Sequence, residues 1–364
     1  MRFIAERPTG RSKPTVTIRR GARRGLRSVF GRLLGSSRLA GRGTTGRVAL
    51  GAAVSLVAVL TAACGAGGVP RQPAPTVRTD PNAVVFGPGR LVSIGNGRSL
   101  YLLCQGSGSP TVILEAGFGG TSDAWSEVQP AVAQRTRTCA YDRGGLGNSP
   151  PIPGVHDAAD EIADLGRLLD RAGIRPPYVL VGHSYGGLLV RLFAHSHPGQ
   201  TAGVVLVDAM GHDQDRRLLR IWLAQPASVR RALPRPSANP VDSGVNVLAG
   251  EDLDAKVKSL GETPLIVITR GRLDENGSGT PFPAPIRHPA AQLWLTMQDE
   301  LAALSPDSIH VIALRSGHFI PFSSGGQPDV VIAAVLGVIH AARTRTHLPP
   351  CQRLFHSSGV QCRK

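Results

Sequence analysis

The sequence lacks the patterns that mark most cofactor-dependent proteins. It contains no internal repeat, no phosphate-cradling P-loop and no metal-ligand spacing. The glycine cluster at residues 117–120 also lacks the continuation that a dinucleotide-binding fingerprint requires. We therefore expect neither a cofactor nor a bound metal. Cysteine is scarce too, with five among 364 residues.

No long membrane-spanning run is present near the N-terminus. The apolar run at residues 48–60 is short for a span of about 20 residues and suits the core of a signal peptide. Small residues follow it up to Cys64, and this segment resembles the cleavage box of a bacterial lipoprotein, which makes Cys64 the expected acylated residue. We expect an exported protein that is either anchored to the cell membrane through Cys64 or secreted.

Acidic residues are almost absent from the first 47 positions, which hold thirteen arginine or lysine residues and only Glu6. This segment therefore carries +12 of the formal net charge of +16, and the other 317 residues carry only +4. A basic segment can bind nucleic acid. Because this one leads directly into the signal-like run, we expect no nucleic-acid partner.

A candidate nucleophile follows an apolar run at residues 177–181. Gly182, Ser184 and Gly186 form a Gly-x-Ser-x-Gly pattern, and apolar residues that favour a helix come next. A strand followed by a sharp turn and a helix would present the Ser184 hydroxyl above a sheet, with the helix N-terminus beneath it. The pattern alone is weak in a chain with 44 glycines, but its context favours a nucleophile elbow.

A serine hydroxyl needs a base to take its proton. Residues 308–314 are rich in branched apolar side chains and predict a strand, and His318 lies in the glycine-bearing loop after it. His310 lies inside that strand and His183 inside the elbow, so both suit structural roles better. We predict His318 as the base.

The acid that orients the base has two candidates. Asp274 comes three residues after Gly271, which follows the buried-type strand predicted at residues 264–269. Asp208 ends the strand predicted at residues 204–207, where its simpler role is to cap backbone N–H groups. We prefer Asp274 and keep Asp208 as the alternative.

These residues resemble the α/β-hydrolase superfamily over roughly residues 90–343. The strand and glycine turn at residues 111–120 are similar to its oxyanion-hole loop, and residues 142–149 to its Asp-x-x-Gly-x-Gly-x-Ser loop. Ala116 stands where the family often has histidine. Serine at the nucleophile position argues against the dehalogenase and epoxide-hydrolase branches, which would require aspartate there.

The backbone N–H groups of Phe118 and Tyr185 are the expected oxyanion hole. The neighbouring Gly117, Gly119 and Gly120 suit a backbone that must approach a substrate closely.

The resemblance also suggests how the cysteines pair. In the sheet order of the α/β-hydrolases the second and fourth strands are neighbours, which would allow a bridge between Cys104 and Cys139. Cys351 and Cys362 flank a short polar C-terminal loop. Four cysteines permit three pairings, and an even number behind a signal peptide favours disulfides.

The resemblance implies an α/β-hydrolase fold, with a mostly parallel eight-stranded sheet flanked by helices. We divide the chain into a leader and signal peptide (residues 1–64), a linker (65–82), a hydrolase domain (83–345) and a C-terminal tail (346–364). A helical lid is expected at about residues 210–262, and a helix at residues 156–172.

The sequence thus predicts an exported serine hydrolase of the carboxylesterase or lipase kind. It would cleave a small-molecule acyl substrate through an acyl-enzyme on Ser184. The alternative is a non-catalytic cell-surface binding protein on the same scaffold, against which the presence of both Ser184 and His318 argues.

Overall fold

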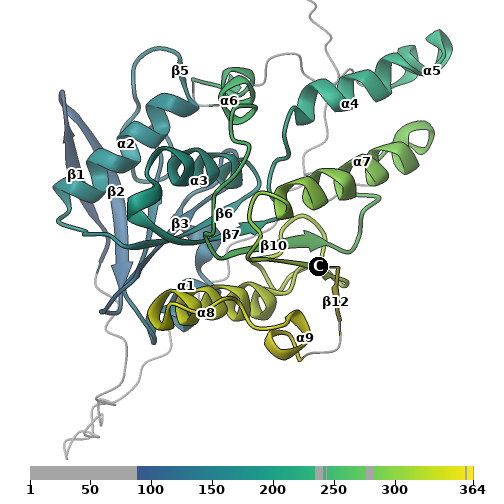
Figure 1. Ribbon diagram of the computed structural model, residues 1–364. Helices are drawn as coiled ribbons and strands as arrows, with labels where there is room; N and C mark the ends of the chain where they lie inside the picture. Colours follow the sequence, from purple (N-terminus) through teal and green to yellow (C-terminus); the bar gives the residue numbers. More distant parts are fainter. Residues whose placement is uncertain (1–87, 234–240, 243, 276–281, 357–358, 364) are drawn as a thin grey trace, which may run out of the picture. The chain divides into compact units, whose positions relative to one another are not determined.

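A computed structural model describes residues 88–233, 241–242, 244–275, 282–356 and 359–363 (Figure 1). The expected leader, the candidate lipidation site Cys64 and the linker at residues 65–82 lie outside these ranges.

The centre of the molecule is a nine-stranded sheet with the order β1-β2-β4-β3-β6-β7-β10-β11-β12. Of these strands, β2 and β12 run opposite to the other seven. Their bounds are β1 (Arg90–Gly95), β2 (Arg98–Gln105), β3 (Thr111–Glu115), β4 (Thr138–Asp142), β6 (Tyr178–His183), β7 (Thr201–Val207), β10 (Leu265–Arg270), β11 (Ser308–Ala313) and β12 (Val360–Cys362). Every residue of β3, β6 and β10 is buried, as expected for parallel strands that are covered on both faces.

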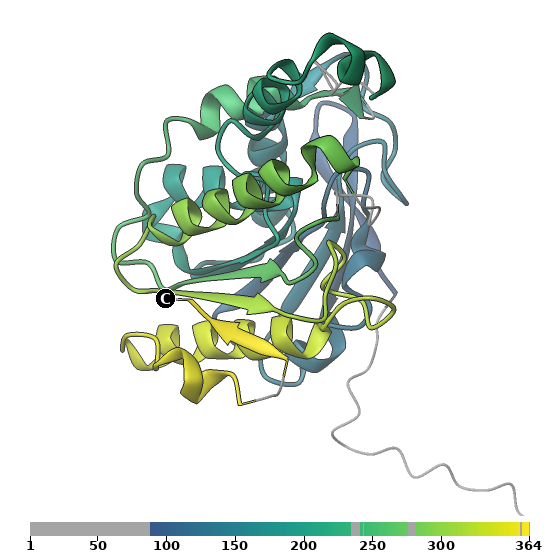
Figure 2. The same cartoon turned by 90° about the vertical axis from the view of Figure 1, so that its right-hand side faces the viewer.

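Helices cover both faces of the sheet (Figures 1 and 2). One layer consists of α2 (Ala158–Arg171), α3 (Tyr185–Ser196) and α7 (Ala284–Ala302). The other consists of α1 (Gln129–Ala133) and α8 (Pro328–Thr344), with α9 (Cys351–Leu354) beside α8. Short 3₁₀ turns form η1 (Ser122–Trp125) and η2 (Pro198–Gln200).

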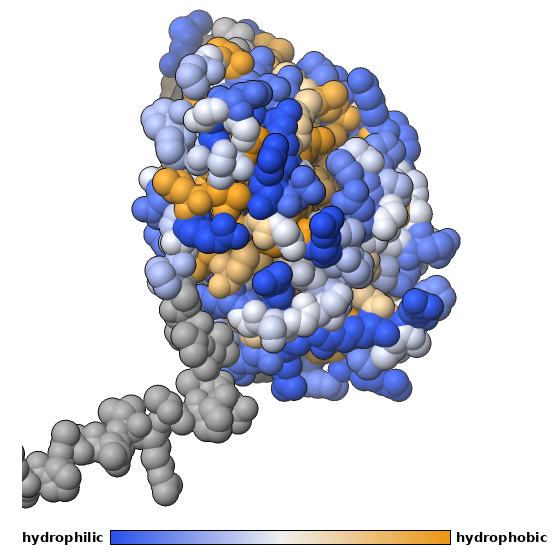
Figure 3. Space-filling view, turned by 90° about the vertical axis from the view of Figure 1, so that its left-hand side faces the viewer, coloured by the Kyte–Doolittle hydropathy of each residue, from blue (hydrophilic) through white to orange (hydrophobic). Residues whose placement is uncertain are grey.

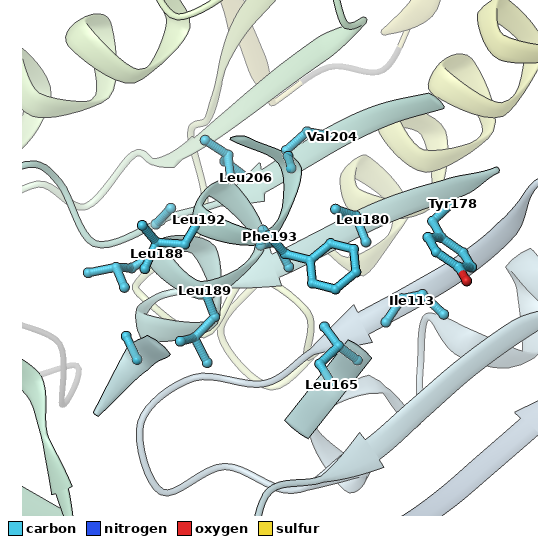
Figure 4. Packing of buried hydrophobic residues seen from close by; sticks show 14 of the residues in the cluster. Ile113, Leu165, Tyr178, Leu180, Leu188, Leu189, Leu192, Phe193, Val204 and Leu206 are labelled. Atoms are coloured by element: carbon cyan, nitrogen blue, oxygen red, sulfur yellow. The ribbon is translucent and has the colours of Figure 1, made fainter. Parts of the chain in front are cut away.

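Alternating side chains of each strand supply two apolar cores. In β6, Leu180 faces α3 and packs in one cluster with Leu188 and Phe193 (Figure 4). Its neighbours Val179 and Val181 belong to the second cluster, under α8. This alternation follows from the two-residue period of a strand. It anchors β6 from both faces just before the chain enters the elbow.

The segment between β7 and β10 contains the expected lid. It forms α4 (Gln214–Leu223), α5 (Ala227–Ala232), β8 (Val241–Asp242), β9 (Val245–Asn246) and α6 (Val247–Asp254). A small sheet joins β8 and β9 to β5 (His156–Asp157), in the order β5-β9-β8.

The face of the molecule in Figure 3 is mostly hydrophilic, with hydrophobic patches between polar side chains.

Two details differ from the sequence prediction. The main sheet has nine strands rather than eight, because the expected C-terminal loop places β12 against β11. Helix α2 begins two residues later than predicted, since the Asp157 side chain caps it in a reciprocal capping box with Asp160.

Both predicted disulfides are confirmed. Cys104 and Cys139 are bonded and stand directly opposite each other on β2 and β4. Cys351 and Cys362 are bonded across the C-terminal segment, which fastens β12 next to α9. Within the described ranges, no helix combines the length and the apolar character that a membrane crossing requires.

Candidate active site

Ser184 occupies a sharp turn between β6 and α3. Its backbone has φ of 53° and ψ of −120°, a region that residues other than glycine rarely adopt. The turn fits because a Cβ on Gly182 would overlap the Gly186 carbonyl, and one on Gly186 would overlap the backbone at Ala116. The expected strand–turn–helix context of the serine is therefore present, for the steric reason that the pattern implies.

His318 lies in the loop after β11, as predicted, and its side chain is almost fully buried. Its Nδ1 is 2.6 Å from Oδ2 of Asp208, which directly follows β7. An imidazole held at Nδ1 by a carboxylate leaves Nε2 to exchange protons, which is the geometry of a general base.

Asp208 is fully buried and accepts hydrogen bonds from two further residues. The backbone N–H and the guanidinium of Arg270 donate to it over 3.1 and 2.8 Å, and Nε1 of Trp294 donates over 2.9 Å. Burial pushes the pKa of this carboxyl upward, but the Arg270 cation and the hydrogen bond from His318 hold it below its usual range. The acid is therefore ionised at neutral pH.

The structure brings the alternative acid Asp208, rather than the preferred Asp274, to His318. Asp274 is exposed. It lies in a turn in which the Leu273 N–H donates a hydrogen bond to the Gly271 carbonyl. The buried Arg270, at the end of β10, lies against His318.

His183 packs beside the base, with 4.7 Å between the two ring centroids. Its Nε2–H donates to the His318 carbonyl over 2.9 Å. Burial, and secondarily the charge of His318, lower the pKa of His183 to about 3. His183 is therefore neutral, and its hydrogen bond holds the loop that carries His318.

The loop after β3 approaches the nucleophile closely. A Cβ on Gly117 would stand 3.2 Å from the Ser184 Cβ, so glycine allows this approach. Tyr185 is the first residue of α3, where an N–H has no partner within the helix. Among the described residues, the N–H groups of Phe118 and Tyr185 have no hydrogen-bond acceptor. Both donors are thus available near Ser184.

Arg143 holds the loop after β3 through hydrogen bonds to its backbone. Its guanidinium donates to the carbonyls of Ala116 and Gly117 over 2.7 and 2.6 Å. It also pairs with the buried Glu115 and, at 3.2 Å, with Glu161. Burial raises the pKa of Glu115 to about 7, against the lowering effect of Arg143. The network holds the loop that bears Phe118 in place.

Ser184 and His318 line one cavity of about 590 Å³. Its other walls come from the loop after β3, from η1, from the end of β6 and from the loop after β11: Gly117, Phe118, Gly119, Gly120, Thr121, Asp123, Ala124, His183, Phe319 and Phe322. A smaller cavity of about 230 Å³ also has Phe118 and Ser184 in its lining and reaches the lid segment.

Three residues of this site were not found from the sequence: Arg270, Trp294 and Arg143. A charged residue at the end of the otherwise apolar strand β10 was the available signal for Arg270. Trp294 and Arg143 carry no comparable local signal, because their roles depend on contacts with distant segments. In the part of the chain that the structure describes, no three histidine, cysteine or acidic side chains are grouped to hold a metal ion.

Comparisons with known proteins agree with this architecture. Residues 110–243 match the family model described as the alpha/beta hydrolase fold. The uncharacterized protein YqjL of Bacillus subtilis is 26% identical over 239 residues, which is 65% of this chain and 87% of that protein. An AB hydrolase superfamily protein of Gibberella zeae is 34% identical over 97 residues, 26% of this chain and 30% of that protein.

Among solved structures, a thermophilic esterase from Thermogutta terrifontis superposes with a TM-score of 0.50 at 18% identity, over 70% of this chain and 99% of the esterase. At this identity the likeness concerns the fold. Together with the sheet order and the elbow described above, it shows that the chain has the α/β-hydrolase fold.

Proposed function

We propose that this protein is a serine hydrolase that cleaves a carboxylic ester or a related acyl bond through an acyl-enzyme on Ser184. One observation carries the proposal: Ser184 and His318 line the same cavity, and Asp208 is bonded to the far nitrogen of His318. The preferred acid of the proposal is therefore Asp208, the alternative of the sequence prediction.

In this mechanism the Ser184 Oγ attacks the substrate carbonyl carbon while His318 Nε2 takes the hydroxyl proton. The N–H groups of Phe118 and Tyr185 stabilise the oxyanion of the tetrahedral intermediate. When the bond to the leaving group breaks, His318 gives it the proton. Water then attacks the acyl-enzyme with His318 as base, which releases the acid and restores Ser184.

Labelling with a fluorophosphonate probe tests the nucleophile. The protein should be labelled at Ser184, and Ser184→Ala should lose both labelling and ester hydrolysis, with turnover reduced on the order of 10⁶-fold. Labelling at a different serine would reassign the nucleophile. A folded protein with neither labelling nor hydrolysis would support the non-catalytic binding protein instead.

We also propose that the protein is exported and anchored through an acylated Cys64. Two disulfides support an oxidising compartment outside the cytoplasm. Cys64→Ser should block processing or release the protein from the membrane fraction, since two acyl chains anchor stably where one is marginal. Unchanged size and fractionation of this variant would refute the anchor and leave the hydrolase proposal intact.

A further inference from the structure

Two cavities meet at Ser184. Of the described residues that line them, the cavity of about 590 Å³ and the cavity of about 230 Å³ share Ser184 and Phe118. The Phe118 ring stands edge-on to the Tyr185 ring, with centroids 5.9 Å apart, and is 43% exposed. Phe118 therefore forms a partition, and a substrate bound at Ser184 has one compartment on each side.

The position of His318 assigns the two sides. His318 lines the larger compartment and not the smaller one. The leaving group takes its proton from His318, so it must lie on the side of that ring. The acyl group stays bonded to Ser184 and extends to the other side of the partition.

From this arrangement we propose, building on the hydrolase function above, that the substrates are neutral esters that join a short acyl group to a bulky apolar alcohol. The acyl group occupies the smaller compartment and the alcohol the larger one.

The smaller compartment sets the acyl length. Its walls include the buried side chains of Tyr185, Met210 and Val247, with Gln214 and Asp215 from the start of α4. A volume of about 230 Å³ holds about eight groups the size of a water molecule, at ~30 Å³ each. This is room for an acyl chain of up to about six carbons.

The larger compartment suits an aromatic or alicyclic alcohol. Phe118, Phe319 and Phe322 supply three phenyl faces in it, and Phe319 is 45% exposed although it is apolar. Aromatic walls favour flat apolar groups through offset and edge-to-face contacts. Its volume lies within the range of cavities that enclose drug-sized molecules.

The charges on both sides favour an uncharged substrate. Asp123 lines the larger compartment and Asp215 the smaller, and among the described residues neither compartment has a lysine or arginine in its lining. An anionic group would meet a carboxylate and find no counter-charge, which disfavours its desolvation.

The acyl side is tested with a series of benzyl esters from acetate to dodecanoate. We expect kcat/KM to fall at least tenfold between hexanoate and octanoate. Met210→Ala removes three non-hydrogen atoms from the compartment, so it should raise the ratio of octanoate to butanoate kcat/KM about tenfold. Leu223→Ala, on the exposed end of α4 outside both linings, is the matched control and should leave this ratio unchanged.

The alcohol side is tested by comparing benzyl butanoate with ethyl butanoate, whose leaving groups have similar intrinsic reactivity. Wild type should favour the benzyl ester at least tenfold, and Phe322→Ala should reduce this preference without moving the acyl-length limit. If Phe322→Ala shifts the acyl-length limit of kcat/KM and Met210→Ala does not, the assignment of the compartments is wrong.

Fluorophosphonate labelling separates this inference from the proposed function. If Ser184 is labelled but octanoate and dodecanoate react as well as butanoate, the inference is wrong and the hydrolase proposal stands. If Ser184 is not labelled and no ester is cleaved, both are wrong.

Discussion

At the scale of single residues, Asp208 is held by four hydrogen bonds. Its two oxygens accept from the Arg270 backbone, the Arg270 guanidinium, the Trp294 indole and the His318 ring. A carboxylate offers about four lone-pair positions, so these donors fill it. The carboxylate cannot turn without breaking several hydrogen bonds, and it therefore fixes the orientation of His318.

We predict that Asp208→Asn lowers kcat about 10⁴-fold, because an amide no longer selects the imidazole tautomer that accepts the serine proton. Asp274→Asn is the matched control. It should change kcat less than twofold, since Asp274 is exposed. Ester hydrolysis measured on both variants, with circular dichroism to verify folding, decides between the acids; a larger loss in Asp274→Asn would contradict the assignment.

His183 should make the protein sensitive to acid. Its pKa is lowered to about 3 in the folded state by burial, and secondarily by the His318 charge, whereas the unfolded value is near 6.5. The unfolded state therefore binds more protons between these values. The contribution of His183 to stability is complete above pH 6.5 and is lost as the pH falls toward 3.

At pH 5 this loss amounts to about 2 kcal/mol of unfolding free energy. His183→Gln should have a flatter dependence of stability on pH between 7 and 5 than wild type, as measured by urea denaturation. Parallel curves for the two proteins would show that His183 does not titrate in this way.

At the scale of elements, the strand–turn–helix unit of β6 and α3 depends on close backbone contacts. Gly186 lies in the first turn of α3, and a Cβ there would overlap the carbonyl oxygens of Glu115 and Ala116. These are backbone atoms of the neighbouring strand and the loop after it, so they cannot move aside as a flexible side chain would. The elbow and the oxyanion loop are thus fitted to each other.

Gly186→Ala should lower the free energy of unfolding by about 3 kcal/mol and strongly reduce ester hydrolysis. Helix propensity alone predicts the opposite effect, because alanine is favoured over glycine within a helix by about 1 kcal/mol. Gly199→Ala, where an added Cβ meets nothing within 4 Å, should change stability by no more than about 0.5 kcal/mol. Equal stabilities of the two variants in urea would contradict the steric explanation.

At the scale of the whole molecule, the two disulfides lie near opposite edges of the sheet. Cys104–Cys139 joins β2 to β4 near one edge, and Cys351–Cys362 fastens the segment that forms the other edge strand, β12. Edge strands have only one neighbour to hold them. The second link therefore secures an edge strand, whereas the first joins two strands that each have a neighbour on both sides.

The two bridges should stabilise the protein unequally. The sequence separations are 35 and 11 residues. In the chain-entropy model these correspond to about 4 and about 3 kcal/mol. Replacing both cysteines of one bridge by alanine should cost these amounts in urea denaturation, with the larger loss for Cys104 and Cys139. The reverse order would show that native contacts of the tail outweigh loop entropy.

Local patterns in the sequence were sufficient for much of the site. The elbow could be predicted from Gly182, Ser184 and Gly186, because the steric requirement of that turn acts within five residues. His318 could be placed because a buried-type strand and a glycine loop lie directly beside it. The order of strands and the Cys104–Cys139 pairing came from the family resemblance, which the fold now bears out.

Only the tertiary structure shows which of the two candidate acids contacts His318. Asp208 and Asp274 follow adjacent parallel strands, so their sequence surroundings place both near the same edge of the sheet. The outcome depended on Arg270 and Trp294, which are 62 and 86 residues from Asp208 in the chain and compensate its burial by donating to it. The strand β12 likewise required the exposed edge of β11 to pair with. Contacts of this kind arise from packing between distant segments, and no local pattern encodes them.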